Sequence, residues 1–122
     1  MREVTNTQKR GTLTWIGQAV SGVLLLGLLG LHMIAHHFIV EGGLRNYQQV
    51  LDYVGNPVIV AIEIVFLIVV TFHAMVGLRS VILDIGLMAK QEKTVTRVLT
   101  VLGLVIVVYG IFLALTLFSR AA

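Results

Sequence analysis

Three long apolar runs, separated by two polar connectors, dominate the sequence. Residues 13–40 form a run of 28 positions without a formal charge, and further runs follow at about 57–83 and 95–118. A helix needs about 20 apolar residues to cross the hydrocarbon core of a bilayer. The pattern therefore predicts an all-α fold, a single domain in which three membrane-spanning helices pack as a bundle.

The polar segments predict how these spans are joined. Residues 1–12 are predicted to form a solvent-facing arm, and residues 84–94 a charged connector. Asn56 before Pro57 is typical of a helix start, with an N-cap followed by proline in the first turn. Residues 41–56 carry apolar side chains at helical spacing, which indicates a short amphipathic helix at the membrane interface. These side chains are Leu44, Tyr47, Val50, Leu51 and Val54.

The composition agrees with a membrane protein. The chain is 57% hydrophobic and 12% charged, which is too apolar for a soluble domain of 122 residues. The first apolar run is much longer than the core of a signal peptide, so we expect no cleaved leader. Because there is no cysteine, a disulfide framework, a thiolate metal site and the covalent attachment of c-type haem are excluded. Any haem must be held non-covalently.

The positions of the nine Lys and Arg residues predict the orientation in the membrane. Three lie in the N-terminal arm, four lie at or near the second connector, and two lie on the opposite side. Cytoplasmic loops carry the excess of positive charge. We therefore expect the N-terminus and the second connector in the cytoplasm and the C-terminus outside. The positive charge follows this topology, and no nucleic-acid partner is expected.

The middle apolar run contains His73, and an ionisable residue inside a membrane is usually functional. Gly77, Ser80 and Asp84 follow at offsets of 4, 7 and 11, so they share one helical face with it. An imidazole beside a residue without a side chain would allow a flat cofactor to be ligated and to lie close to the backbone. The alternative is a histidine that only forms a hydrogen bond with a neighbouring helix.

The first run contains His32, which lies at a different depth. With a rise of about 1.5 Å per residue, His32 is roughly 28 Å from the cytoplasmic end of its span, whereas His73 is roughly 15 Å from that end. This difference is too large for the two to ligate one haem iron from opposite sides. If both are ligands, they serve two haems. The second ligand of each must come from another polypeptide, since no further histidine of this chain has the depth of His73.

Other polar residues of the spans support a buried face. A stripe of the first span is predicted to face the bundle. Glu63 has a depth comparable with His36 and His37, and a hydrogen bond or ion pair between them is expected. His36 and His37 also remain alternatives to His32 as ligands. Arg79, near the cytoplasmic exit, is predicted to snorkel, or to pair with a carboxylate or a haem propionate. The stripe comprises Gln18, Ser21, Leu25, Leu28, Leu29, His32 and His36.

The pattern His73-x-x-x-Gly77-Leu78-Arg79, followed by Asp84 and Gly86, resembles the membrane anchor subunits of succinate dehydrogenase and fumarate reductase, which form respiratory complex II. The resemblance extends into the first span, where a Ser-Gly pair at 21–22 precedes the histidine at position 32. It covers about residues 15–86. The third run matches only in length and apolar character.

This resemblance implies a function and partners. His73 resembles the axial ligand of a haem b nearer the cytoplasm, and His32 resembles the ligand of a second, outer haem. Each haem would be shared with a second membrane anchor subunit, and this chain would be a three-span anchor, with the D-type favoured over the C-type. A flavoprotein would oxidise succinate, an iron-sulfur subunit would pass the electrons on, and the anchors would complete the reduction of quinone in the cell inner membrane.

The resemblance is incomplete at the quinone. Many members carry an arginine where this chain has Ala19, and some carry a tyrosine where it has Ile85. The chain is therefore expected to contribute only a wall of a quinone site, with Gln18, Ser21 and Asp84 as candidates.

Nothing in the sequence supplies a nucleophile or a nucleotide site, so no catalysis by the chain alone is expected. Two alternatives are a haem anchor of another membrane oxidoreductase, and a transport or assembly subunit with an intramembrane relay of histidine and glutamate.

Overall fold

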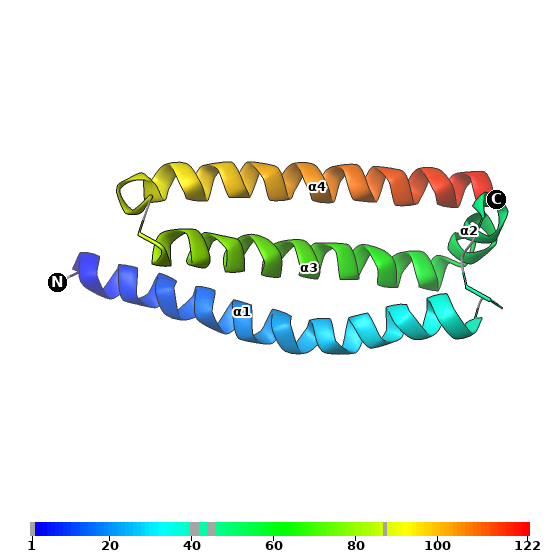
Figure 1. Ribbon diagram of the computed structural model, residues 1–122, viewed down its shortest axis with the longest axis horizontal. Coiled ribbons are helices and arrows are strands. Elements are labelled where there is room, and N and C mark those ends of the chain that lie inside the picture. Colours follow the sequence, from blue (N-terminus) through cyan, green and yellow to red (C-terminus); the bar gives the residue numbers. More distant parts are fainter. Residues whose placement is uncertain (1, 40–41, 44–45, 87) are drawn as a thin grey trace.

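Three long helices make up most of the chain in the computed structural model, which describes residues 2–39, 42–43, 46–86 and 88–122. They are α1 (Arg2–Ile34), α3 (Pro57–Asp84) and α4 (Glu92–Ala121). The helices lie in a row, with α3 between α1 and α4 (Figure 1). No strand occurs among the described residues. The all-α fold predicted from the sequence is therefore confirmed.

Shorter elements complete the fold. α1 continues into one π-helical segment, η1 (Ala35–Ile39), and a 3₁₀ turn, η2 (Ala89–Gln91), precedes α4. The predicted amphipathic helix is α2 (Tyr47–Val54), which lies between the first and second long helices. Leu44, the first apolar residue of the predicted pattern, lies outside the described residues. Three helical segments of the described chain are long and apolar enough to cross a membrane, namely Gln8–Phe38, Pro57–Asp84 and Glu92–Ala121.

The helix ends follow from local chemistry. The Asn56 side chain accepts a hydrogen bond from the Val58 amide at 2.9 Å, and Pro57 occupies the first turn of α3, as predicted. Gly86 follows the end of α3 and has φ of 78°, in the left-handed region that favours glycine. At the other end of the chain the polar arm does not stand apart, because α1 begins at Arg2 and the arm is its first turns.

The connections lie at opposite ends of the molecule. The N-terminus is beside the link between α3 and α4, and α2 lies with the C-terminus at the other end (Figure 1). α2 packs there against α4 and α3. Arg120 donates a hydrogen bond to the Tyr47 hydroxyl at 3.4 Å, and Tyr53 is only 5% exposed. The amphipathic helix thus covers one end of the row.

Small residues bring α3 and α4 together. A Cβ atom added at Gly103 would lie 3.1 Å from the Met75 side chain, and one added at Gly110 would overlap Leu67. These glycines are seven positions apart, so both lie on the face of α4 that packs against α3. Helices in a bilayer gain little from the hydrophobic effect between them, so close backbone contact is a main source of their packing energy.

Replacing Gly110 with leucine is expected to destabilise the α3–α4 pair by about 1–3 kcal/mol, because the new side chain must displace Leu67 in a packed contact. The measurement is the thermal aggregation midpoint of the full chain in detergent. Gly27→Leu is the matched control, since no atom lies within 4 Å of a Cβ added at Gly27. Equal midpoints for the two variants would contradict the packing role of Gly110.

Candidate functional site

His73 is a residue of α3 and faces α1, whose polar side chains contact it. The Ser21 hydroxyl is 3.0 Å from Nδ1 of His73, and the Gln18 amide nitrogen donates to the His73 carbonyl at 3.3 Å. Ser21 is 5% exposed. The predicted stripe of α1 thus does face α3, except at Leu29, which is 47% exposed.

The serine determines which nitrogen of His73 carries the proton. Ser21 Oγ also lies 3.0 Å from the Gln18 carbonyl, and only the hydroxyl can donate in that contact. The hydroxyl oxygen is then left to accept from Nδ1–H of His73. In a neutral imidazole the other nitrogen, Nε2, must carry a lone pair. Among the described residues Nε2 has no hydrogen-bond partner, so it is available to ligate a metal.

Two glycines differ in how they shape the site formed by His73, Ser21 and Gln18, called the inner site below. A Cβ atom at Gly22 would lie 3.3 Å from Cε1 of His73, so the small residue makes room for the imidazole. A Cβ atom at Gly77 would lie 3.1 Å from Nε2 of Gln18, so that amide fills the space that the sequence pattern offered to a flat cofactor. Oε1 of Gln18 is buried and has no hydrogen-bond partner within the described residues.

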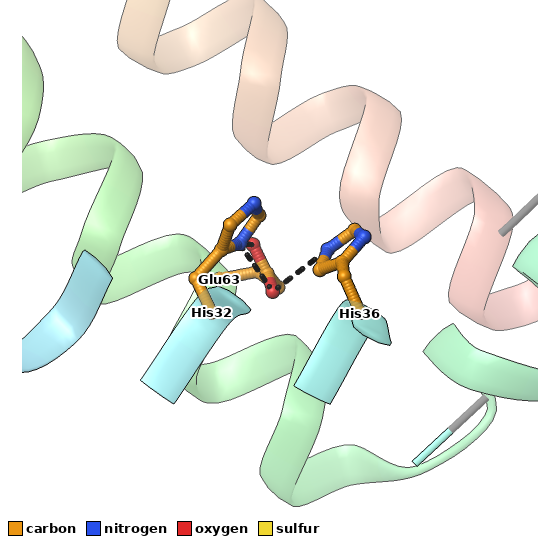
Figure 2. Close-up of side chains that lie close together, drawn as sticks. All are labelled: His32, His36 and Glu63. Carbon is orange, nitrogen blue, oxygen red and sulfur yellow. Dashed lines mark hydrogen bonds and ion pairs between the residues drawn. The ribbon is translucent and has the colours of Figure 1, made fainter. Parts of the chain in front are cut away.

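A second polar cluster, formed by His32, His36, Tyr53 and Glu63, lies near the α2 end. Nδ1 of His32 lies 3.0 and 2.9 Å from the two carboxylate oxygens of Glu63. The Tyr53 hydroxyl donates to Oε1 of the same carboxylate at 2.7 Å, and Nε2 of His36 lies 3.6 Å from it. Figure 2 shows both imidazoles on α1 and η1 directed at the carboxylate on α3.

This cluster differs from the predicted pairing of Glu63. The expected contact with His36 is present, but the shorter of the two histidine contacts is to His32, and His37 is exposed. Residues 32 and 36 are four apart and share one helical face, whereas residue 37 lies about 100° further round. Tyr53 was not predicted, because nothing in its local sequence indicates that α2 folds against α3.

The two histidines remain far apart along the bundle. Ser21 meets His73 and His32 meets Glu63, and these pairs are separated by 11 positions on α1 and 10 on α3. The separation is about 15 Å at 1.5 Å per residue. This agrees with the depths counted from the sequence. Among the described residues, no other histidine lies beside His73.

The remaining candidates lie toward the α3–α4 connector. Arg79 donates to Glu92 and to Thr96, both at 2.7 Å, so the predicted pairing with a carboxylate is made within the chain. Glu92 is 60% exposed, which makes this a surface ion pair of small energy. Asp84 is exposed at the end of α3. The structure therefore does not bring Arg79 and Asp84 next to His73.

This polar cluster of His32, His36, Tyr53 and Glu63, called the outer cluster below, also has the composition of a metal site. One ligand atom each from His32, His36 and Glu63 lie within 4.8 Å of one another. Two imidazoles and a carboxylate are a common donor set for divalent zinc. At the inner site, the described residues offer only the single imidazole of His73.

Comparison with known proteins identifies the family. Residues 3–115 match the family model described as succinate dehydrogenase/fumarate reductase transmembrane subunit. The chain is 29% identical to a succinate dehydrogenase hydrophobic membrane anchor subunit of Thermoplasma acidophilum, over 91% of this chain and 90% of that protein. It is 31% identical to the subunit of the same name from Archaeoglobus fulgidus, over 83% and 86%. No solved structure gives a significant match.

These matches cover nearly the whole chain, and they agree with the three helices that are able to span a membrane. The chain is a multi-pass membrane protein that belongs to the family of succinate dehydrogenase and fumarate reductase transmembrane subunits.

Proposed function

We propose that this anchor subunit binds haem b and supports electron transfer from the iron-sulfur clusters of its complex to quinone. The observation that carries the proposal is the hydrogen bond between Ser21 and Nδ1 of His73. A metal-ligating histidine nearly always donates its other ring N–H to a fixed acceptor, which sets the tautomer and orients the ring. A histidine that merely joined two helices would not need Nε2 left open.

The same arrangement recurs at the outer site. His32 donates from Nδ1 to Glu63 and keeps Nε2 on the far edge of its ring, away from the carboxylate (Figure 2). His73 would hold an inner haem and His32 an outer one. A haem held by two imidazoles would supply one-electron transfer and would not bind oxygen or substrate. This chain would contribute His73 and His32, each held in orientation by the hydrogen bond at its Nδ1.

The proposal requires a partner. Because His73 and His32 are about 15 Å apart along the bundle, neither can complete the other's ligation. Each haem would be shared with a second anchor subunit, and the chain would take the D-type place in a two-haem enzyme. Apolar side chains of α1 and α3, among them Val23, Leu26 and Val65, are exposed on the single chain and leave surface for such a partner. An iron-sulfur subunit and a flavoprotein subunit would bind at the cytoplasmic side.

Quinone would bind near the cytoplasmic end, beside the inner haem. Gln18 supports this, because its buried Oε1 lacks a hydrogen-bond partner among the described residues and can accept from a quinol hydroxyl. Ser21 and Asp84 remain candidates for the same site. Arg79 is held by Glu92 and Thr96, so contact with a haem propionate would require it to share its guanidinium.

The orientation proposed from the basic residues places the N-terminus in the cytoplasm. The N-terminus and the α3–α4 link lie at the same end of the row (Figure 1), and seven of the nine Lys and Arg residues belong to these two regions. The outer cluster and the C-terminus would then face the outside of the cell inner membrane.

A reduced-minus-oxidised spectrum of the complex, purified with its partner subunits, tests the proposal. Two b-type haems per complex are expected, with the split bands of bis-histidine iron. Extraction and quantification of the haem gives the stoichiometry independently. A complex that contains no haem and still reduces quinone with succinate at full rate would contradict the proposal.

A second candidate function is a divalent metal or proton relay at the outer cluster. The grouping of His32, His36 and Glu63 within 4.8 Å is the observation that favours it. Metal analysis and haem quantification of the same preparation separate these functions. A metal site predicts a stoichiometric divalent metal and no outer haem, whereas a proton relay predicts neither a metal nor an outer haem.

A further inference from the structure

The Nδ1 atoms of the two proposed haem ligands meet acceptors of different charge. His73 donates to the neutral hydroxyl of Ser21 at 3.0 Å, whereas His32 donates to both carboxylate oxygens of Glu63 at 3.0 and 2.9 Å. A carboxylate that accepts this hydrogen bond raises the basicity of the imidazole, and a hydroxyl does so far less. The two ligands therefore differ in how strongly they donate electron density to a metal.

Other side chains hold Glu63 in place. The Tyr53 hydroxyl donates to Oε1 at 2.7 Å, and Nε2 of His36 lies 3.6 Å from the same oxygen. Burial first, and then the hydrogen bond with Glu63, raise the pKa of Tyr53 well above its usual value, so the phenol remains a donor. The ring of Phe66, one turn along α3 from Glu63, lies with its centroid 5.0 Å from that of His32. These contacts restrict both the carboxylate and the imidazole.

We propose that Glu63 is a positioning residue for the outer haem, which fixes the ligating nitrogen of His32 and lowers the reduction potential of that haem. This inference rests on the proposed function. Ferric iron carries one more positive charge than ferrous iron, so a negative charge that acts through the imidazole stabilises the ferric state. Tyr53 opposes this effect, because its hydrogen bond withdraws part of the charge of the carboxylate.

The first test is Glu63→Gln in the complete complex with its partner subunits. The amide keeps an oxygen that accepts from Nδ1 of His32 but removes the negative charge. A redox titration followed in the haem bands is expected to show a higher midpoint for the outer haem and an unchanged midpoint for the inner one. An increase of about tenfold in the ratio of ferrous to ferric outer haem at a fixed potential corresponds to about 59 mV for one electron.

The second test is Tyr53→Phe, which removes one hydrogen-bond donor from the carboxylate without touching His32. Its expected shift has the opposite sign, toward a lower midpoint of the outer haem. A residue that only supports packing would not give opposite shifts in these two variants. Ser21→Ala is the matched control, because it removes the acceptor at His73 and is expected to change the inner haem alone.

The results separate this inference from the proposed function. An outer midpoint that is unchanged in both variants, or two haems that shift equally, would overturn the role of Glu63 while leaving haem binding intact. Where Glu63→Gln loses the haem, the sign of the shift in Tyr53→Phe decides. A wild-type complex with stoichiometric zinc and no outer haem would instead overturn the assignment of His32.

Discussion

Replacing His73 with alanine is expected to remove the inner haem completely and to leave the outer haem in place. His73 is the only histidine at its depth, since its pair Ser21–His73 lies about 15 Å along the bundle from His32 and Glu63. A methyl group cannot ligate iron, and no neighbouring side chain of the described structure offers another nitrogen ligand there. The measurement is the reduced-minus-oxidised spectrum of the purified complex, with the haem quantified after extraction.

His37→Ala is the control for this variant, because His37 is exposed and does not belong to either polar site. It is expected to retain both haems. Retention of the inner haem bands in His73→Ala would show that His73 only joins α3 to α1 through Ser21. The amount of anchor subunit recovered distinguishes loss of the inner haem alone from loss of the whole complex. If the whole complex is lost, the inner haem bands are followed in Ser21→Ala, which keeps the imidazole of His73.

Replacing His32 is expected to remove the outer haem and to leave the inner one. Alanine has a second effect, because it removes both contacts of His32 with the Glu63 carboxylate, at 2.9 and 3.0 Å, and only Oε1 keeps its hydrogen bond from Tyr53. An unsatisfied acceptor in a buried setting costs about 1–3 kcal/mol. His32→Gln avoids most of this cost, since its amide can still donate to Glu63. Loss of the outer bands in both variants, with lower stability only in the alanine variant, is the expected result.

Haem content and the thermal aggregation midpoint of the complex are measured for both His32 variants. If the outer bands survive both substitutions, His36 becomes the outer ligand, since its imidazole already lies in the same cluster, with its ring centroid 4.0 Å from that of His32. If the outer haem survives in both His32 variants and is lost in His36→Ala, the outer ligand is His36 and not His32. The division into two haem sites would not change.

The position of His36 shows where helical periodicity reaches its limit. From the sequence, residues 32 and 36 share a face of a regular α-helix, and the stripe predicted from Gln18 onward places that face toward the bundle. The structure keeps this face, but through the π-helical segment at Ala35–Ile39. Such segments are frequent at functional sites, and periodicity does not reveal them because they change the local turn by only one residue.

The sequence by itself determined the three spans, the helix start at Asn56, the facing stripe of α1 and the separate depths of His32 and His73. Each of these depends on local pattern, either the length of an apolar run or a spacing along one helix. Depth could be counted because an α-helix rises by a fixed amount per residue.

Only the tertiary structure decided which side chain each polar group meets. Ser21 meets Nδ1 of His73 and Tyr53 meets Glu63 because α1, α2 and α3 pack in one particular register and rotation. Gln18 fills the space beside Gly77 for the same reason. Contacts between helices depend on how far each is shifted and turned relative to its neighbour. The residue pattern of one helix does not specify its shift or rotation relative to a neighbouring helix. The tautomers of the histidines therefore became evident only from the folded chain.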